Sequence, residues 1–156
     1  MAIYQIQTVQ KLPISLEKAW EFLSSPYNLK VITPPNMGFE ILNGVKETDK
    51  MFAGQIIVYN ITPLPLYKTE WVTEITHVKE GEYFIHQQRF GPYALWHHKH
   101  HLTAIEGGVL MTDTIHYKLP FGWLGQIANT LMVKKQLKKI FDFRHTTLEK
   151  LFGKMD

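Results

Sequence analysis

Four histidines stand almost side by side in the stretch 97–101, which makes this stretch the first candidate for chemistry. In a β-strand, successive side chains point to opposite faces, so these histidines divide between two faces and do not form one metal-binding tract. The alternate set that contains His98 and His100 is the more apolar, and it also includes Ala94, Trp96, Leu102 and Ala104. We therefore expect these two histidines to point into the protein beside Trp96. The outward-pointing side chains should be those of His97, Lys99 and His101.

Two further charged residues are expected to face the interior. In the stretch 109–119, the apolar alternate set contains Met111, Ile115, Tyr117 and Leu119, and Asp113 belongs to it. Near the C-terminus, Arg144 lies within the apolar stripe that runs from Leu137 to Leu148. A guanidinium group is permanently charged and needs a carboxylate or carbonyl partner when it is buried. Asp113 is the inward carboxylate that these patterns provide.

The expected cluster of His98, His100, Asp113 and Arg144 has three possible roles. Burying such groups unpaired costs several kcal/mol, so they should satisfy one another or meet a ligand or water. They could form a structural network, the polar end of a ligand cavity, or a metal site in which His98, His100 and Asp113 are the ligands. Any alternating strand with two histidines shows the His-x-His spacing, so we assign no metal site and expect no cofactor.

Several kinds of catalysis are excluded by residue types that are missing or already explained. The chain contains no cysteine, which rules out a disulfide framework, a thiolate metal site and Cys–His catalysis. It contains no glycine-rich phosphate loop and no nucleophile elbow. Its three serines, at positions 15, 24 and 25, stand at expected helix starts, where capping accounts for them.

The overall composition is typical of a globular protein that is rich in aromatic residues. Of the 156 residues, 45% are hydrophobic, 20% are charged and 13% are aromatic. The net charge of +3 includes a group of lysines near the C-terminus, which we interpret as the solvated face of a helix and not as a nucleic-acid site. No leader pattern and no long apolar run is present, so we expect a cytoplasmic protein without a transmembrane segment.

The elements that must position the cluster follow from turn chemistry and periodicity. The N-terminus alternates as a first strand, and Ser15 and Ser25-Pro26 begin two short helices, the second of which should end before Pro34. Strands are expected at 38–43, 53–61, 67–78, 82–90, 94–105 and 109–119. The turns between them are Asn43-Gly44, Pro63 with Pro65, Glu80-Gly81, Gly91-Pro92 and Gly107-Gly108. Short connections make neighbouring strands antiparallel, which predicts an α+β fold in one domain, 1–156.

The C-terminal stretch 122–152 is expected to form two helical segments. One face carries Leu124, Ile127, Ala128 and Leu131. Another face, rotated by more than about 120°, carries Leu137, Ile140, Phe141, Leu148 and Leu151. One straight helix cannot bury both faces against one sheet. We therefore predict a break near Val133, with 134–152 as the long helix and 122–132 as a separate apolar segment near a cavity mouth.

The order of these elements and four sequence phrases resemble the START/birch-pollen-allergen (SRPBCC) superfamily, and more closely its bacterial ligand-binding members, including a module fused to some epimerase-like proteins. The phrases are LKVITPP at 29–35, FGPY at 90–93 leading to Trp96-x-His98-x-His100, Asp113-x-Ile115-x-Tyr117-x-Leu119-Pro120-x-Gly122, and Phe141-x-x-Arg144-His145. The resemblance implies a helix-grip fold: a seven-stranded curved antiparallel sheet around a long C-terminal helix, with two short helices after strand 1. One departure is His86, where such sequences more often carry an Asp.

The resemblance also implies an internal cavity but no particular reaction. Our leading hypothesis is a non-enzymatic carrier or sensor for an apolar or amphipathic small molecule, such as a lipid, a quinone or a polyketide-like ring. The polar cluster would orient one end of that molecule. The expected ligand-binding residues are Tyr59, Trp71, His86, Phe90, Trp96, His98, His100, Asp113, Tyr117 and Arg144.

Two alternatives to simple ligand binding stay open. One is a cyclase- or hydrolase-like enzyme in which His98 or His100 acts as a general base oriented by Asp113. The other is an accessory module in which the segment Trp123–Met132, followed by lysines, docks transiently on a membrane or on an epimerase-like partner. A lid or core helix is the simpler interpretation of that segment.

Overall fold

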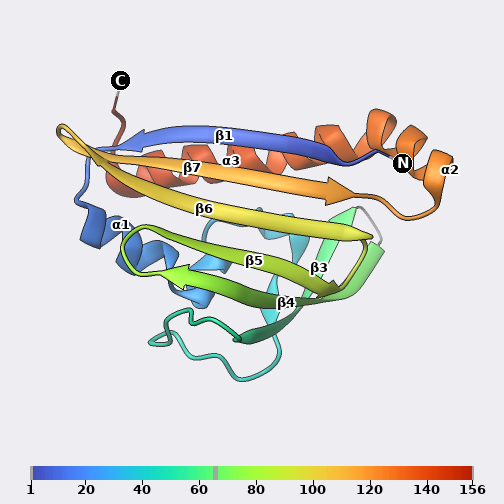
Figure 1. Cartoon of the computed structure of the whole chain (residues 1–156), viewed down its shortest axis with the longest axis horizontal. Coiled ribbons are helices and arrows are strands. Elements are labelled where there is room, and N and C mark those ends of the chain that lie inside the picture. The colour runs from blue at the N-terminus through green and yellow to red at the C-terminus, as the bar shows by residue number, and fades with distance from the viewer. Residues whose placement is uncertain (1, 65–66, 156) are drawn as a thin grey trace.

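The computed structural model describes residues 2–64 and 67–155. Its described part contains a seven-stranded antiparallel sheet in the order β1-β7-β6-β5-β4-β3-β2 (Figure 1). The first strand in the chain therefore lies beside the last one. The strands are β1 (Tyr4–Leu12), β2 (Glu40–Ile41), β3 (Ile56–Leu64), β4 (Tyr67–Lys79), β5 (Tyr83–Phe90), β6 (Leu95–Ile105) and β7 (Gly108–Lys118). This is the expected α+β fold.

Two short helical elements follow β1, as predicted. Helix α1 (Leu16–Leu23) is capped by the hydroxyl of Ser15, which accepts a hydrogen bond from the backbone N–H of Lys18 at 3.2 Å. Pro26 begins the second element, which is a 3-10 helix, η1 (Pro26–Lys30), and ends slightly earlier than expected. Pro35 begins a further 3-10 turn, η2 (Pro35–Met37).

The expected strand at 38–43 is reduced to the two-residue edge strand β2, which pairs with β3. The Asn43 side chain explains this difference. Its amide nitrogen donates to the Ile56 carbonyl at 2.7 Å, and its oxygen accepts from the Val58 N–H at 3.1 Å. A side chain thus takes over backbone positions that a longer strand would occupy. The turn expected at Pro63 and Pro65 cannot be compared in full, because Pro65 lies outside the described residues.

The predicted break in the C-terminal stretch is present. Helix α2 (Gly122–Ala128) runs into a π-helical turn, η3 (Asn129–Val133), which leads into the long helix α3 (Lys134–Phe152). A π-turn holds an additional residue compared with an α-turn, and so it rotates the following helix face. This rotation lets α3 turn one stripe toward the sheet, with Leu137, Phe141, Arg144 and Leu148 buried.

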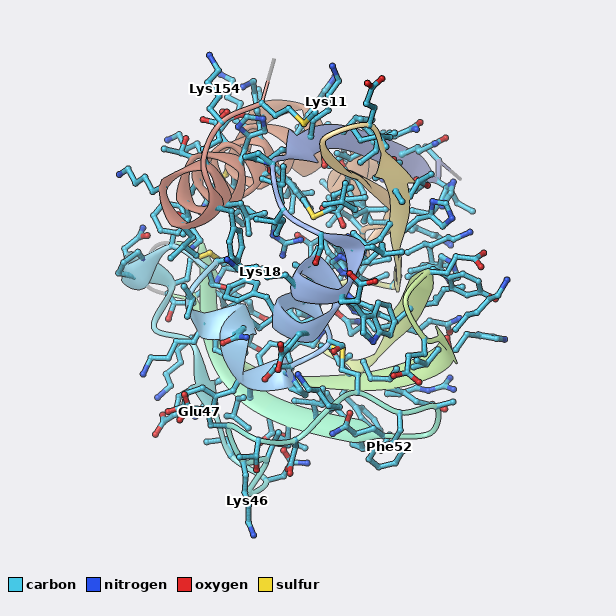
Figure 2. All side chains as sticks on the ribbon, turned by 90° about the vertical axis from the view of Figure 1, so that its left-hand side faces the viewer. Lys11, Lys18, Lys46, Glu47, Phe52 and Lys154 are labelled. Atoms are coloured by element: carbon cyan, nitrogen blue, oxygen red, sulfur yellow. The ribbon has the colours of Figure 1, made fainter. Side chains whose placement is uncertain are left out.

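Helix α3 lies on the concave side of the sheet, and apolar side chains fill the space between them. In the end-on view of Figure 2, the sheet curves around one side of the molecule, while Lys46 and Lys154 point outward. The most buried side chains include Leu12 on β1, Val109 and Ile115 on β7, and Leu148 on α3. The arrangement confirms the helix-grip architecture, and it leaves the inward faces of β5, β6 and β7 to position polar groups.

Candidate functional site

Three adjacent strands place the polar cluster on the inner face of the sheet. His86 on β5 pairs with His98 on β6, and His100 on β6 pairs with Asp113 on β7. Burial alternates along β6 and β7 and along the first half of β5, with each of these residues at a buried position. The inward orientation of His98, His100 and Asp113 thus agrees with the sequence pattern. Asp113 is only 1% exposed, so it needs partners within the protein.

Asp113 is the centre of the cluster. Its Oδ1 atom accepts a hydrogen bond from His98 Nε2 at 3.0 Å, and His100 Nδ1 lies 2.6 Å from the same oxygen. The other oxygen, Oδ2, lies 3.5 Å from Nη1 of Arg144, which extends from α3. On the far side of His100, its Nε2 atom lies 3.2 Å from Nε2 of His86. The predicted pairing of Arg144 with Asp113 is therefore present as a close ion pair.

The electrostatics of the cluster favour neutral histidines around a charged carboxylate. Burial lowers the pKa of His98 to about 3, and repulsion from His100 contributes. Burial also lowers the pKa of His86 and of His100. For Asp113, burial raises the pKa, but the neighbouring His100 and His98 together hold it well below the usual range. At neutral pH the carboxylate charge of Asp113 is thus balanced by Arg144.

Two adjoining cavities lie between the sheet and α3. The inner cavity, of about 80 Å³, is lined by His86, His98, Arg144 and mostly apolar side chains. Among these, the Trp71 and Trp96 rings meet edge to face with their centroids 5.4 Å apart. The outer cavity, of about 220 Å³, is lined almost entirely by apolar groups. The two cavities share four lining residues: Pro63, Tyr93, Leu137 and Ile140.

Several of the buried polar atoms without a hydrogen-bond partner belong to residues that line the inner cavity. Among the described residues, these donors are Nε1 of Trp71, Nε1 of Trp96, and Nε and Nη1 of Arg144, of which Nη1 has only the ion pair with Asp113 at 3.5 Å. Nδ1 of His86 is unpaired as well. All four residues line this cavity and are at least nine-tenths buried. Unsatisfied buried groups are unusual in folded proteins and call for a partner.

The structure brings most of the expected site residues together. Those that line the inner cavity are Tyr59, Trp71, His86, Trp96, His98 and Arg144. Asp113 and His100 lie behind His98 and hold it in place. Tyr117 is buried against Trp96 and Tyr93 but does not line either cavity.

Phe90 differs from the other expected site residues because it lies at the surface: it is 72% exposed, whereas each of the others is buried. The reason is an irregularity at the end of β5. Val72 pairs with Phe90, but its neighbour Thr73 pairs with Gln88, so one extra residue is accommodated on β5. Such a bulge breaks the strict alternation of faces. The side chain at position 90 therefore does not share the inward face of His86.

The sequence patterns did not identify Tyr93, which lines both cavities. It belongs to the turn between β5 and β6, where no periodicity indicates which way a side chain points. Gln88 fixes this turn: its side chain donates to the Tyr93 carbonyl at 2.6 Å and accepts from the Tyr93 N–H at 3.2 Å. Leu137 and Phe141, by contrast, could have been found, because they share the helical stripe of Arg144.

Helix α2 lies at the end of the sheet where β1 begins and β7 ends (Figure 1). Phe121, Gly125 and Val133 line the outer cavity, so this segment borders its mouth as expected. Its large apolar side chains nevertheless face outward, with Trp123 69% exposed and Leu131 64% exposed. The segment therefore borders the cavity but is not a core helix. Across the described residues, no helix is both long and apolar enough to cross a membrane.

Comparisons with known proteins support the fold and not a specific activity. No protein-family model matches the sequence, and neither does any curated protein. Among solved structures, protein CV1439 from Chromobacterium violaceum is similar, with a TM-score of 0.70 and 13% identity, over 97% of this chain and 99% of that one. Ginseng major latex-like protein 151 from Panax ginseng gives 0.67 and 12%, over 96% and 97%. Ara h 8.0201 gives 0.59 and 13%, over 96% and 99%.

Each of these three solved structures has the fold of this chain over nearly its whole length. At such low identities, the likeness establishes the architecture alone. Any statement about a ligand of this protein must therefore come from the geometry of its own cavities.

Proposed function

We propose that this protein is a carrier or sensor that binds an amphipathic small molecule in the two adjoining cavities. The apolar body of the molecule, a ring or a short chain, would occupy the outer cavity. An end group that carries oxygen atoms would reach into the inner cavity. The observation that carries this proposal is the set of buried donors without hydrogen-bond partners on Trp71, Trp96 and Arg144, three residues that all line the inner cavity.

The balance of donors and acceptors indicates the chemistry of the end group. The indole N–H groups of Trp71 and Trp96 and the guanidinium group of Arg144 can only donate hydrogen bonds. A carbonyl, quinone or carboxylate oxygen accepts such bonds, and it would satisfy groups that are otherwise buried without partners. An amine nitrogen accepts only one hydrogen bond and would leave more of these donors unsatisfied.

The cavity volumes support a small ligand that spans both spaces. An engineered cavity of about 150 Å³ holds a benzene molecule, so the inner space of about 80 Å³ accepts only a small group. The outer space of about 220 Å³ accommodates a ring. Because the two spaces share Tyr93 and Leu137, a modest movement of these side chains would join them.

Two matched probes test this proposal: naphthoquinone, which has two carbonyl oxygens, and naphthalene, which has the same ring system without them. The chain lacks cysteine, so the quinone has no thiol to react with. Binding is measured by saturation-transfer NMR and by tryptophan fluorescence. We expect naphthoquinone to bind about tenfold more tightly, which corresponds to one or two net hydrogen bonds.

The matched variants are Arg144→Met and Arg89→Met. Arg144→Met should abolish the preference for the quinone, whereas Arg89→Met should preserve it, because Arg89 lies at the surface and pairs with Glu74. Equal affinity of the wild-type protein for both probes, or a crystal structure in which side chains fill both cavities, would refute the proposal. If naphthoquinone is preferred as expected, native mass spectrometry of protein purified from its own host would identify the natural ligand.

The enzyme alternative receives less support from the electrostatics. A general base works best when its pKa is near the working pH. Burial lowers the pKa of His98 to about 3, which makes this imidazole a weak base. An enzyme that uses His98 or His100 should show a bell-shaped dependence of rate on pH, and alanine at either position should abolish turnover.

A further inference from the structure

A group of three buried histidines on the inner face of the sheet has a geometry that the proposed ligand binding does not require. His86, His98 and His100 each offer one nitrogen, and these nitrogens all lie within 4.8 Å of one another. We propose that the three side chains bind a divalent transition-metal ion, with zinc or cobalt as the best-suited ions. This metal site goes beyond the proposed function and does not depend on it.

The spacing of the His86 and His100 nitrogens is close to that of a tetrahedral metal site. Zinc–nitrogen bonds of about 2.0–2.1 Å place two nitrogens on a tetrahedral ion roughly 3.3 Å apart. The two Nε2 atoms are 3.2 Å apart. The widest separation in the trio, 4.8 Å, exceeds the tetrahedral value, so metal binding requires a side-chain movement of roughly 1.5 Å.

The three histidines lie on two strands that are paired on both sides. His98 and His100 lie two residues apart on one face of β6, and His86 faces His98 across the β5–β6 pair. Both strands are interior to the sheet, with β4 on one side and β7 on the other. Ligands on paired strands are held more precisely than ligands on loops, which favours metal binding.

Asp113 orients the histidines and is not itself one of the three ligands. Its Oδ1 lies 2.6 Å from Nδ1 of His100, which leaves Nε2 of His100 to face His86. A carboxylate behind a histidine is the usual support for a metal-bound imidazole, because it fixes the tautomer and makes the nitrogen more basic. Asp113 also accepts a hydrogen bond from Nε2 of His98, which leaves Nδ1 of that ring available. The proposed ligands are therefore His86, His98 and His100. In the metal site considered from the sequence, Asp113 was the third ligand in place of His86.

The charges around the three histidines are compatible with a metal cation. The positive charge of Arg144 opposes a second cation, but Asp113 compensates it at 3.5 Å. His86 and His98 line the inner cavity beside Arg144, so the fourth coordination position would face that cavity and take water or an anionic group.

In the competing explanation, His86 and His100 form a hydrogen bond with each other and bind no metal ion. To distinguish them, the protein is treated with a chelator and then titrated with Co²⁺, and the visible absorption of tetrahedral cobalt is recorded. Elemental analysis after zinc loading gives the stoichiometry. We expect one ion per chain and the replacement of cobalt by zinc. An absence of binding by the folded wild-type protein would overturn the proposal.

Two matched variants assign the ion to its site. His86→Gln should weaken metal binding by at least about tenfold. His97→Gln should leave it unchanged, because His97 lies on the outer face of β6 beside His116, where an adventitious ion could bind. The reverse pattern would place the ion on the surface and refute the inner site.

A third variant keeps the test decisive if His86→Gln does not fold, which circular dichroism will reveal. His86→Asp supplies a carboxylate oxygen as a ligand in place of a nitrogen. It should retain binding but change the cobalt spectrum. An identical spectrum in wild type and His86→Asp would show that position 86 does not contact the ion.

Discussion

Acidification should destabilise this protein strongly between about pH 6.5 and pH 3, because three buried histidines are held neutral. In the unfolded chain, a histidine takes up a proton near pH 6.5. Burial lowers the pKa of His98 in the folded protein to about 3, and it lowers the pKa of His86 and His100 as well. Between these values the unfolded state binds more protons than the folded state, so the free energy of unfolding falls as the pH falls.

The contribution of His98 can be estimated. Each pH unit below the unfolded pKa costs about 1.4 kcal/mol per histidine, so His98 alone should remove roughly 2 kcal/mol at about pH 5. His86 and His100 act in the same direction. Domains of this size are stable by about 5–15 kcal/mol, so the loss is a large part of the total. The carboxylate of Asp113, whose pKa is also lowered, adds to the loss only below its own unfolded pKa of 3.8.

The assay is urea unfolding at a series of pH values, monitored by circular dichroism and tryptophan fluorescence. The slope of the unfolding free energy against pH counts the protons taken up. His98→Gln keeps a donor for Asp113 but removes a titrating group, so it should reduce the slope by about one proton. The matched control variant is His101→Gln, on the outer face of the same strand. A free energy that stays flat from about pH 7 to pH 5 would refute the neutral histidine cluster.

Three further outcomes are expected. Leu148→Ala should lower the free energy of unfolding by about 2–5 kcal/mol, because the Leu148 side chain is fully buried against the sheet. Leu151→Ala should change it by less than about 1 kcal/mol, because Leu151 is exposed. Similar losses for both variants in urea unfolding would contradict the assigned helix face. Trp96→Phe removes an unpaired buried donor, so stability should change by less than about 1.5 kcal/mol while naphthoquinone affinity, measured by NMR, falls; unchanged affinity would separate Trp96 from the ligand. Trp123→Glu should reduce co-sedimentation with anionic vesicles if the exposed face of α2 contacts membranes, and equal sedimentation of both proteins would exclude that contact.

The sequence predicted the parts of the site that regular strands and helices position. Alternation along β6 and β7 was enough to place His98, His100 and Asp113 inside, and the helical stripe placed Arg144 beside them. These predictions succeeded because each element keeps its period without interruption across the site.

The predictions failed where the period is interrupted or absent. A bulge near the end of β5 moved Phe90 out of the expected face, and no pattern indicates a bulge before the strand pairing is known. Tyr93 lies in a turn, where its direction depends on the Gln88 side chain. The unpaired donors could not be predicted at all, since a hydrogen-bond partner is a property of three-dimensional geometry.

The pairing of β1 with β7 has a consequence for synthesis on the ribosome. β1 lies at the edge of the sheet, and its neighbour β7 is translated roughly a hundred residues later, which makes this the most non-local pairing in the sheet. At typical translation speeds of about 5–20 residues per second, β1 would wait for several seconds with its backbone donors and acceptors open. The nascent chain should therefore be a chaperone client during that interval, and its risk of aggregation should depend on translation speed as well as on the stability of the finished fold.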